Sequence, residues 1–128
     1  MAGLHRRTWM TLGAMTGFVS IAMGAFAAHA IKDPVAKDLI KTGAQYGFSH
    51  TMATFASAAF MQMGARSARF APAMFLPGIV LFSGSLYALA LGAPRWIGAI
   101  TPIGGLLFLS GWAWLAWSAR DLDRPLHP

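Results

Sequence analysis

An uncharged stretch of 23 residues, from residue 8 to residue 30, constrains the fold of this chain more than any other feature of its sequence. As a helix it would span about 34 Å, which is enough to cross the hydrocarbon core of a bilayer. Only 11% of the 128 residues are charged, whereas a soluble domain carries about 25%. We therefore predict an integral membrane protein in which residues 1–128 form a single membrane domain.

The end of this first stretch also resembles a cleavage site for a signal peptide, because small Ala28 and Ala30 flank His29. The apolar core of a signal peptide is only about 7–15 residues long. The greater length here favours a retained transmembrane span over a cleaved leader.

Three more apolar stretches follow the first one, and each is long enough to cross a membrane as a helix. The predicted fold is an all-α, antiparallel four-helix transmembrane bundle, and all 14 charged residues fall outside its spans. The predicted spans are residues 8–30, 42–64, 72–91 and 101–118.

A charged segment separates the first two predicted spans. Asp33 followed by Pro34 matches the N-cap and first position of a helix. We expect a short interfacial helix at residues 33–41, lying at the membrane surface, with a bend into the second span near Gly43.

The Lys and Arg residues near the span ends predict the orientation of the chain. With four spans, both termini share a side with the loop that contains Arg66 and Arg69. That side holds six Lys or Arg residues against four on the other side, which predicts that both termini are cytoplasmic. The six are Arg6, Arg7, Arg66, Arg69, Arg120 and Arg124, and the four are Lys32, Lys37, Lys41 and Arg95.

Glycines recur at spacings of three and four within the predicted spans, and small residues so placed allow helices to approach closely. Gly43 and Gly47, for example, form a GxxxG pair in the second span. The general abundance of glycine in membrane helices is the other explanation, and it predicts no particular partner face. The candidate helix-packing residues are Gly13, Gly17, Gly24, Gly43, Gly47, Gly84, Gly104, Gly105 and Gly111.

Polar side chains inside the predicted spans should face protein, because an unpaired polar group in hydrocarbon is costly. In an antiparallel four-span arrangement the candidates all fall in the outward half of the membrane, where we expect one polar cluster. Its members are His29, Gln45, Tyr46, His50, Tyr87 and Thr101.

Two interpretations of this predicted cluster stay open. The first is a hydrogen-bond network that fixes helix register, in which each bond contributes about 0.6 kcal/mol on average. The second is a site for a metal, a quinone headgroup or a haem held by two histidines. A metal site needs three or four ligands, and only His29 and His50 are available, so we predict no metal and no cofactor.

Other chemistries have less support in the sequence. Ser83 and Ser85 flank Gly84, but the GxSxG pattern of a serine hydrolase is absent and no acid could orient a histidine. The basic residues are scattered at the span ends, which fits lipid headgroups better than nucleic acid. Tryptophans at positions 112, 114 and 117 predict an interfacial belt.

Four motifs follow one another along the chain in this order: GAFAAHAIK, QYGFSH, LFSGSLYALAL and ITPIGGLLFLSGW. Together they resemble the YgdD family of small bacterial inner-membrane proteins, which has a eukaryotic transmembrane-protein branch. The resemblance extends from about residue 13 to residue 117, and it implies four transmembrane helices and an inner-membrane location. It implies no catalytic residue, because the family has no established biochemical activity.

Our leading functional hypothesis is a non-enzymatic accessory or assembly protein of the lipid bilayer. It would act through its glycine-lined helix faces, as a homo-oligomer or beside a larger membrane complex, and without nucleic acid. The alternative is a binding or carrier module for a small lipophilic ligand or a metal at the outer His/Tyr cluster.

Overall fold

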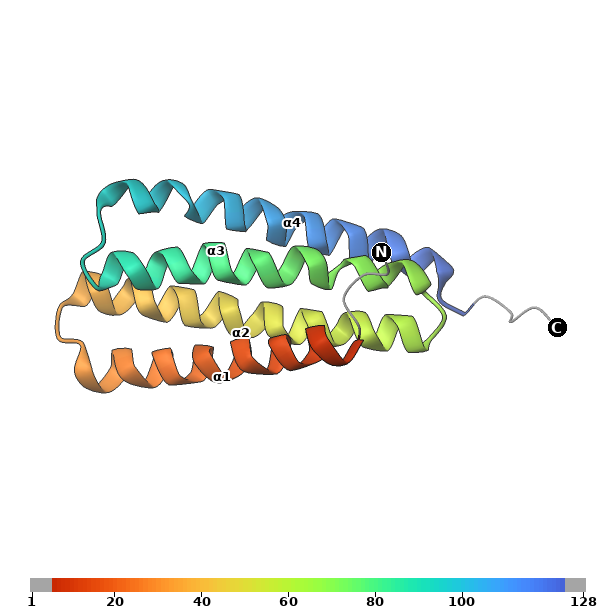
Figure 1. The fold of residues 1–128 in the computed structure, drawn as a ribbon, viewed down its shortest axis with the longest axis horizontal. Coiled ribbons are helices and arrows are strands. Elements are labelled where there is room, and N and C mark those ends of the chain that lie inside the picture. The colour runs from red at the N-terminus through yellow and green to blue at the C-terminus, as the bar shows by residue number, and fades with distance from the viewer. Residues whose placement is uncertain (1–5, 124–128) are drawn as a thin grey trace.

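The structure, a computed structural model, describes residues 6–123 and contains four long α-helices and no strand within that range. Neighbouring helices run antiparallel along a common axis, so the prediction of an all-α antiparallel four-helix bundle is confirmed (Figure 1). The helices are α1 (Arg6–Ala30), α2 (Pro34–Gln62), α3 (Pro72–Ala90) and α4 (Thr101–Ser118), and short 3₁₀ helices are η1 (Arg66–Phe70), η2 (Arg95–Ala99) and η3 (Ala119–Asp121).

Helix α2 is one continuous helix of 29 residues, so the prediction of a separate interfacial helix at residues 33–41 is wrong. The predicted start is correct, because the Asp33 carboxylate accepts a backbone N–H bond of 2.9 Å and Pro34 is the first helical residue. The predicted bend near Gly43 is replaced by regular helix, because Gly43 is buried against α3 and its carbonyl accepts the Ser83 hydroxyl at 2.6 Å. At about 43 Å, α2 is longer than the roughly 30 Å hydrocarbon core of a bilayer.

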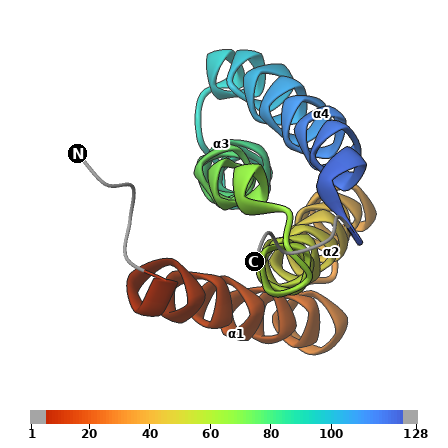
Figure 2. The same cartoon turned by 90° about the vertical axis from the view of Figure 1, so that its right-hand side faces the viewer.

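The helices pack in chain order, with α1 on α2, α2 on α3 and α3 on α4. Direct contacts between α1 and α3, and between α2 and α4, are few. An end-on view shows α1 and α4 on opposite sides of the pair formed by α2 and α3 (Figure 2). This open arrangement leaves one groove between α1 and α3 and a second groove between α2 and α4.

Helix α2 packs between α1 and α3 and is also the most polar of the four helices. Its buried positions include Thr51, Thr54 and Ser57, whose hydroxyls each donate to the carbonyl four residues earlier. Among the residues described, three stretches are long and apolar enough to cross a membrane, and α2 is not one of them. The composition of α2 reflects contact with protein: these hydroxyls bond to carbonyls of α2 itself, and Thr51 and His50 also bond to side chains of α1 and α4. The three stretches are Arg6–Ala30, Arg66–Ala90 and Arg95–Asp121.

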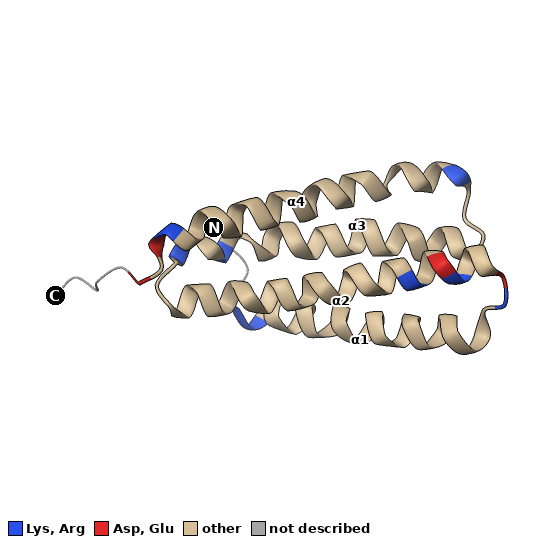
Figure 3. Cartoon of the chain, turned by 180° about the vertical axis from the view of Figure 1, so that it is seen from behind, with Lys and Arg blue, Asp and Glu red and all other residues tan. Residues whose placement is uncertain are grey.

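Charged residues lie at the two ends of the bundle, and the ribbon between them is free of Lys, Arg, Asp and Glu (Figure 3). Among residues 6–123, the Lys and Arg residues at one end are all arginines, at positions 6, 7, 66, 69 and 120. The other end carries Lys32, Lys37, Lys41 and Arg95. Arg124, which contributed to the predicted orientation, lies outside the described residues.

Candidate functional site

His50 on α2 is buried, with only 5% of its surface exposed, and both of its ring nitrogens take part in hydrogen bonds. The indole Nε1–H of Trp112 donates to His50 Nε2 at 2.9 Å. Since an indole N–H can only donate, Nε2 is the acceptor and Nδ1 carries the proton of a neutral ring. Nδ1 then donates to the carbonyl of Tyr46 at 2.7 Å.

Aromatic rings complete the surroundings of His50. The Phe108 ring stacks on the imidazole with a centroid distance of 3.5 Å and an interplanar angle of 10°. Phe75 and Trp112 lie at 5.8 and 5.9 Å, tilted and edge-on. His50 therefore connects α2 to α4, two helices that otherwise make few direct contacts.

This arrangement limits what His50 can do chemically. Both ring nitrogens are engaged, so coordination of a metal or haem would first require loss of the Trp112 bond. The residues described contain no group of three or more side chains of the metal-ligating types His, Cys, Asp and Glu. The geometry thus favours the hydrogen-bond interpretation of His50 over the ligand interpretation.

The other candidates of the predicted polar cluster are distributed over the bundle and do not meet. Tyr46 lies beside His50, with a ring distance of 6.3 Å, and is half-exposed. His29 and Gln45 are exposed. Thr101 pairs with the Ser85 hydroxyl at 2.5 Å, and Tyr87 packs over Gly43 on the α1–α3 side of the bundle.

Sequence reasoning missed the partners of His50. Phe108 and Trp112 are four residues apart, a spacing that places both on one face of α4. We interpreted Trp112 as part of an interfacial belt, but its indole N–H is bonded to α2 instead. Trp114 and Trp117 do lie near the arginine-rich end, where Arg120 stacks over the Trp117 ring at 3.2 Å.

A second polar network joins the first three helices. The hydroxyls of Thr16 on α1 and Thr51 on α2 are 2.6 Å apart. Ser83 on α3 donates to the Gly43 carbonyl on α2 at 2.6 Å, and Ser20 donates to the carbonyl of Thr16 at 2.8 Å. The Tyr87 hydroxyl is buried and makes no hydrogen bond to the described part of the chain.

Most of the candidate glycines lie at contacts between helices of this one chain. A Cβ added at Gly43 would lie 2.8 Å from the Tyr87 ring, and one at Gly111 would lie 2.5 Å from the Phe75 ring. At Gly104 it would collide with the backbone of Phe82. Such contacts leave these glycines unavailable to a second copy of the chain.

The remaining glycines differ in how closely they are approached. A Cβ added at Gly13, Gly17 or Gly24 would face α2, and its distance to the nearest α2 atom would be 3.3, 3.2 or 3.8 Å, respectively. At Gly47 it would lie 2.6 Å from the Ser20 hydroxyl. Gly105 has its nearest neighbour at 4.0 Å, and Gly84 has none within 4 Å. Gly78, which the sequence reasoning did not select, is covered by the Phe108 ring at 2.7 Å.

These features define a small helical membrane protein. Its helices are long and apolar, its charges lie at the ends of the bundle, and its polar groups are turned toward one another. A family model described as "Protein of unknown function (DUF423)" matches residues 23–105. The chain belongs to this DUF423/UPF0382 family, and the resemblance predicted from its motifs is confirmed.

Three relatives illustrate the similarity. The UPF0382 membrane protein of Haemophilus influenzae is 44% identical over 117 residues, which cover 89% of this chain and 94% of the relative. The UPF0382 inner membrane protein YgdD of Escherichia coli K12 is 39% identical, with 92% and 93% covered. The UPF0382 membrane protein YwdK of Bacillus subtilis is 35% identical, with 83% and 90% covered. No solved structure matches the chain.

The comparisons support a location in the bacterial inner membrane, because the Escherichia coli relative is named an inner membrane protein. They describe a family of unknown function and indicate no enzymatic activity. The ligand-binding alternative at the His/Tyr cluster gains no support from them.

Proposed function

We propose that this protein is a four-span inner-membrane protein with both termini in the cytoplasm. The arginine-rich end of the bundle carries both described chain ends and η1, and an excess of Lys and Arg favours the cytoplasmic side. Residues 42–62 of α2 span about 31 Å, which suits a fourth crossing once the charged first turns are excluded.

This topology is testable with reporter fusions. Alkaline phosphatase, which is active only in the periplasm, and a green fluorescent protein that folds only in the cytoplasm are each fused after Pro128. We expect fluorescence and no phosphatase activity. Phosphatase activity at the C-terminus would refute the proposed orientation, and the same fusions placed after Ala93 should give the reverse pattern.

We further propose that the protein acts without catalysis, as an accessory protein that binds a membrane partner through the outer face of α1. The observation that carries this proposal is the division between inner and outer surfaces. Apart from the Tyr87 hydroxyl, the buried polar side chains of the described residues already have hydrogen-bond partners, as in the bonds from Trp112 to His50 and from Ser83 to Gly43. The outer face of α1 instead presents large apolar side chains, and its Phe18, exposed by 76%, is the most exposed large apolar side chain of the described residues.

The outer face of α1 can be tested in living cells with a photo-reactive phenylalanine analogue at position 18. The matched control carries the analogue at Leu106 on α4, where 64% of the side chain is exposed. We expect a discrete protein adduct from position 18 that position 106 does not give. Lipid adducts alone at both positions would refute a protein partner at α1.

A further inference from the structure

The larger of the two grooves lies between α1 and α3 and has a volume of about 640 Å³. Sites for small molecules have volumes of about 300–1,000 Å³, with mostly apolar walls and a few polar groups. The groove follows α3 from Pro72 to Tyr87, a distance of about 22 Å along the helix. It is therefore longer than the roughly 15 Å that one leaflet contributes to the hydrocarbon core.

Alkyl side chains form the long walls of this groove. Leu12, Met15 and Val19 line it from α1, and Leu76 and Val80 line it from α3. Lys and Arg residues lie at both ends of the bundle, but none of the described residues that line the groove is charged. The walls therefore suit a long alkyl chain and offer no partner to a charged headgroup.

Hydroxyl groups gather in the groove toward the C-terminal end of α3. A Cβ added at Gly47 of α2 would lie 2.6 Å from the Ser20 hydroxyl and 3.1 Å from the Ser83 hydroxyl, so these groups from α1 and α3 face the same point. Ser20 donates its proton to the Thr16 carbonyl, and Ser83 donates to the Gly43 carbonyl. Both hydroxyls can accept a further hydrogen bond, but neither has a proton left to donate.

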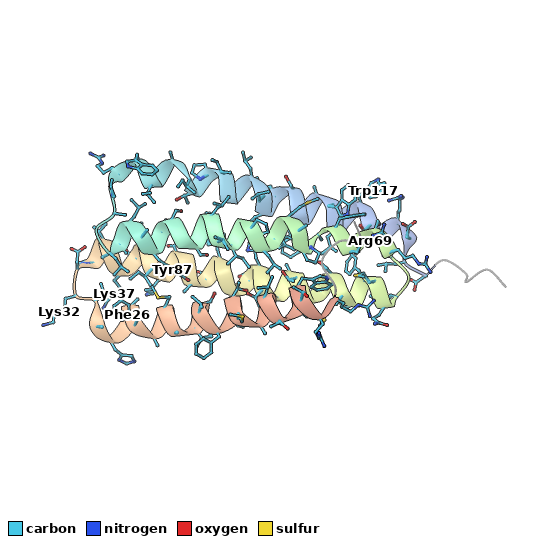
Figure 4. The ribbon with its side chains drawn as sticks, in the orientation of Figure 1. Phe26, Lys32, Lys37, Arg69, Tyr87 and Trp117 are labelled. Atoms are coloured by element: carbon cyan, nitrogen blue, oxygen red, sulfur yellow. The ribbon has the colours of Figure 1, made fainter. Side chains whose placement is uncertain are left out.

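Tyr87 differs from these serines because its proton has no acceptor. Its side chain lines the groove, and its hydroxyl is buried without a hydrogen bond to residues 6–123. The Ser20 oxygen lies beside it. Figure 4 shows Tyr87 toward the end of the bundle that carries Lys32 and Lys37. A buried donor without a partner is destabilising, so an acceptor oxygen at this position would be favourable.

From this combination we infer a binding site for an uncharged, single-chain lipid. Its alkyl chain lies in the α1–α3 groove, and a carbonyl oxygen on its head accepts the Tyr87 proton. The head has to be small because the hydroxyl is buried, and uncharged because no lining residue balances a charge. This site lies apart from His50, which borders the other groove, between α2 and α4.

Two probes that differ only in a carbonyl group test the role of the hydroxyl. Methyl pentadecyl ketone and heptadecane have the same chain length, and equal amounts of both are added to the full chain in mild detergent. Native mass spectrometry then compares their retention. We expect the ketone to be retained about 3- to 18-fold better than the alkane, which corresponds to one hydrogen bond within a membrane.

Tyr87→Phe removes the hydroxyl and keeps the ring that packs over Gly43, so this variant should retain both probes equally. The matched control is Tyr46→Phe, which changes the other tyrosine of the chain, beside the α2–α4 groove, and should keep the preference for the ketone. Equal retention of both probes by the wild type would overturn the carbonyl assignment. An unchanged preference in Tyr87→Phe would also overturn it, and a loss of stability in that variant would then assign the Tyr87 proton to Ser20.

The groove itself is tested by filling it. Gly84 lines the groove, and a Cβ there meets nothing within 4 Å, so Gly84→Leu should fold and occupy the space of the alkyl chain. We expect about a tenfold loss of retention of both probes, the size of an ordinary overpacking penalty. Gly105→Leu, which fills the groove between α2 and α4, is the matched control and should retain both probes like the wild type.

Val80→Phe provides a second way of filling the groove, from a side chain that is 64% exposed. Circular dichroism and thermal unfolding of each variant establish that it is folded. Wild-type retention in both Gly84→Leu and Val80→Phe would overturn the groove assignment.

Two other occupants of the groove are outcomes of the same experiment. Displacement of the ketone by an equal amount of phosphatidylethanolamine would assign the groove to a membrane phospholipid. A dimer of the chain that excludes the ketone would assign it to a second copy. Either result would overturn the inference. Retention in detergent depends neither on the orientation of the chain nor on a partner at α1, which the reporter fusions and the photo-reactive analogue test separately.

Discussion

Gly104 and Gly105 are adjacent residues on α4, yet the structure predicts opposite effects when each is replaced by alanine. A Cβ at Gly104 would lie 2.8 Å from the Cα of Phe82 and closer still to its backbone nitrogen. A Cβ at Gly105 would have its nearest neighbour, the Phe82 ring, at 4.0 Å. Comparing the two variants therefore separates the effect of a collision with backbone atoms from the effect of an ordinary van der Waals contact one residue away.

The cost at Gly104 follows from what has to move. The closest obstructing atoms are backbone, so no change of rotamer relieves the collision. Raising the 2.8 Å distance from the added Cβ to Phe82 Cα to 3.4 Å moves α3 and α4 apart by about 0.6 Å, and the closer Phe82 nitrogen requires more. A gap of 0.5–1 Å forfeits about a quarter to a half of each dispersion contact that it opens. Overpacking of this kind costs about 1–3 kcal/mol, and the higher helix propensity of alanine offsets up to about 1 kcal/mol of it.

We expect Gly104→Ala to lower the free energy of unfolding by about 1–2 kcal/mol and Gly105→Ala to raise it by about 0.5–1 kcal/mol. The assay is unfolding in mixed detergent and SDS micelles, followed by far-UV circular dichroism and tryptophan fluorescence. Equal stabilities of the two variants would refute the close approach of α4 to the Phe82 backbone.

Three further substitutions test other contacts. Trp112→Phe removes the donor to His50 and should lower the free energy of unfolding by about 0.6–1.7 kcal/mol in the same assay, whereas Trp117→Phe should have a smaller effect; equal losses would argue against the indole–imidazole bond. Ser83→Ala removes the bond to the Gly43 carbonyl and should cost about 0.6 kcal/mol, and an unchanged stability would count against this link between α2 and α3. Asp33→Ala removes the N-cap of α2 and should cost about 0.5–2 kcal/mol, with faster amide hydrogen exchange in residues 35–37 as its signature; unchanged exchange there would contradict the cap.

The order and type of the helices could be predicted from the sequence because runs of apolar residues are the dominant signal in a membrane protein. The N-cap at Asp33 was also predictable, since it depends on local chemistry. The continuity of α2 was not, because the behaviour of Gly43 depends on α3, which covers it.

The candidate site was less predictable from the sequence than the fold. His50 could be selected from the sequence because a polar residue within an apolar span is unusual. Its partners Phe108 and Trp112 come from α4, more than 50 residues further along the chain. Periodicity places a residue on a face of its own helix, and it does not say which helix that face meets. For this reason the six polar candidates were expected to form one cluster, and the structure distributes them over both sides of the bundle.

The polarity of α2 has a consequence for biosynthesis. Helix α2 has low hydrophobicity, so it is expected to insert poorly by itself, because membrane insertion depends on the hydrophobicity of each individual segment. Helix α1 leaves the ribosome first and already presents Thr16 and its small residues to α2. The two helices are therefore expected to enter the bilayer as a hairpin around Asp33 and Pro34, so that the stability of the first helix pair determines whether the chain acquires its topology at all.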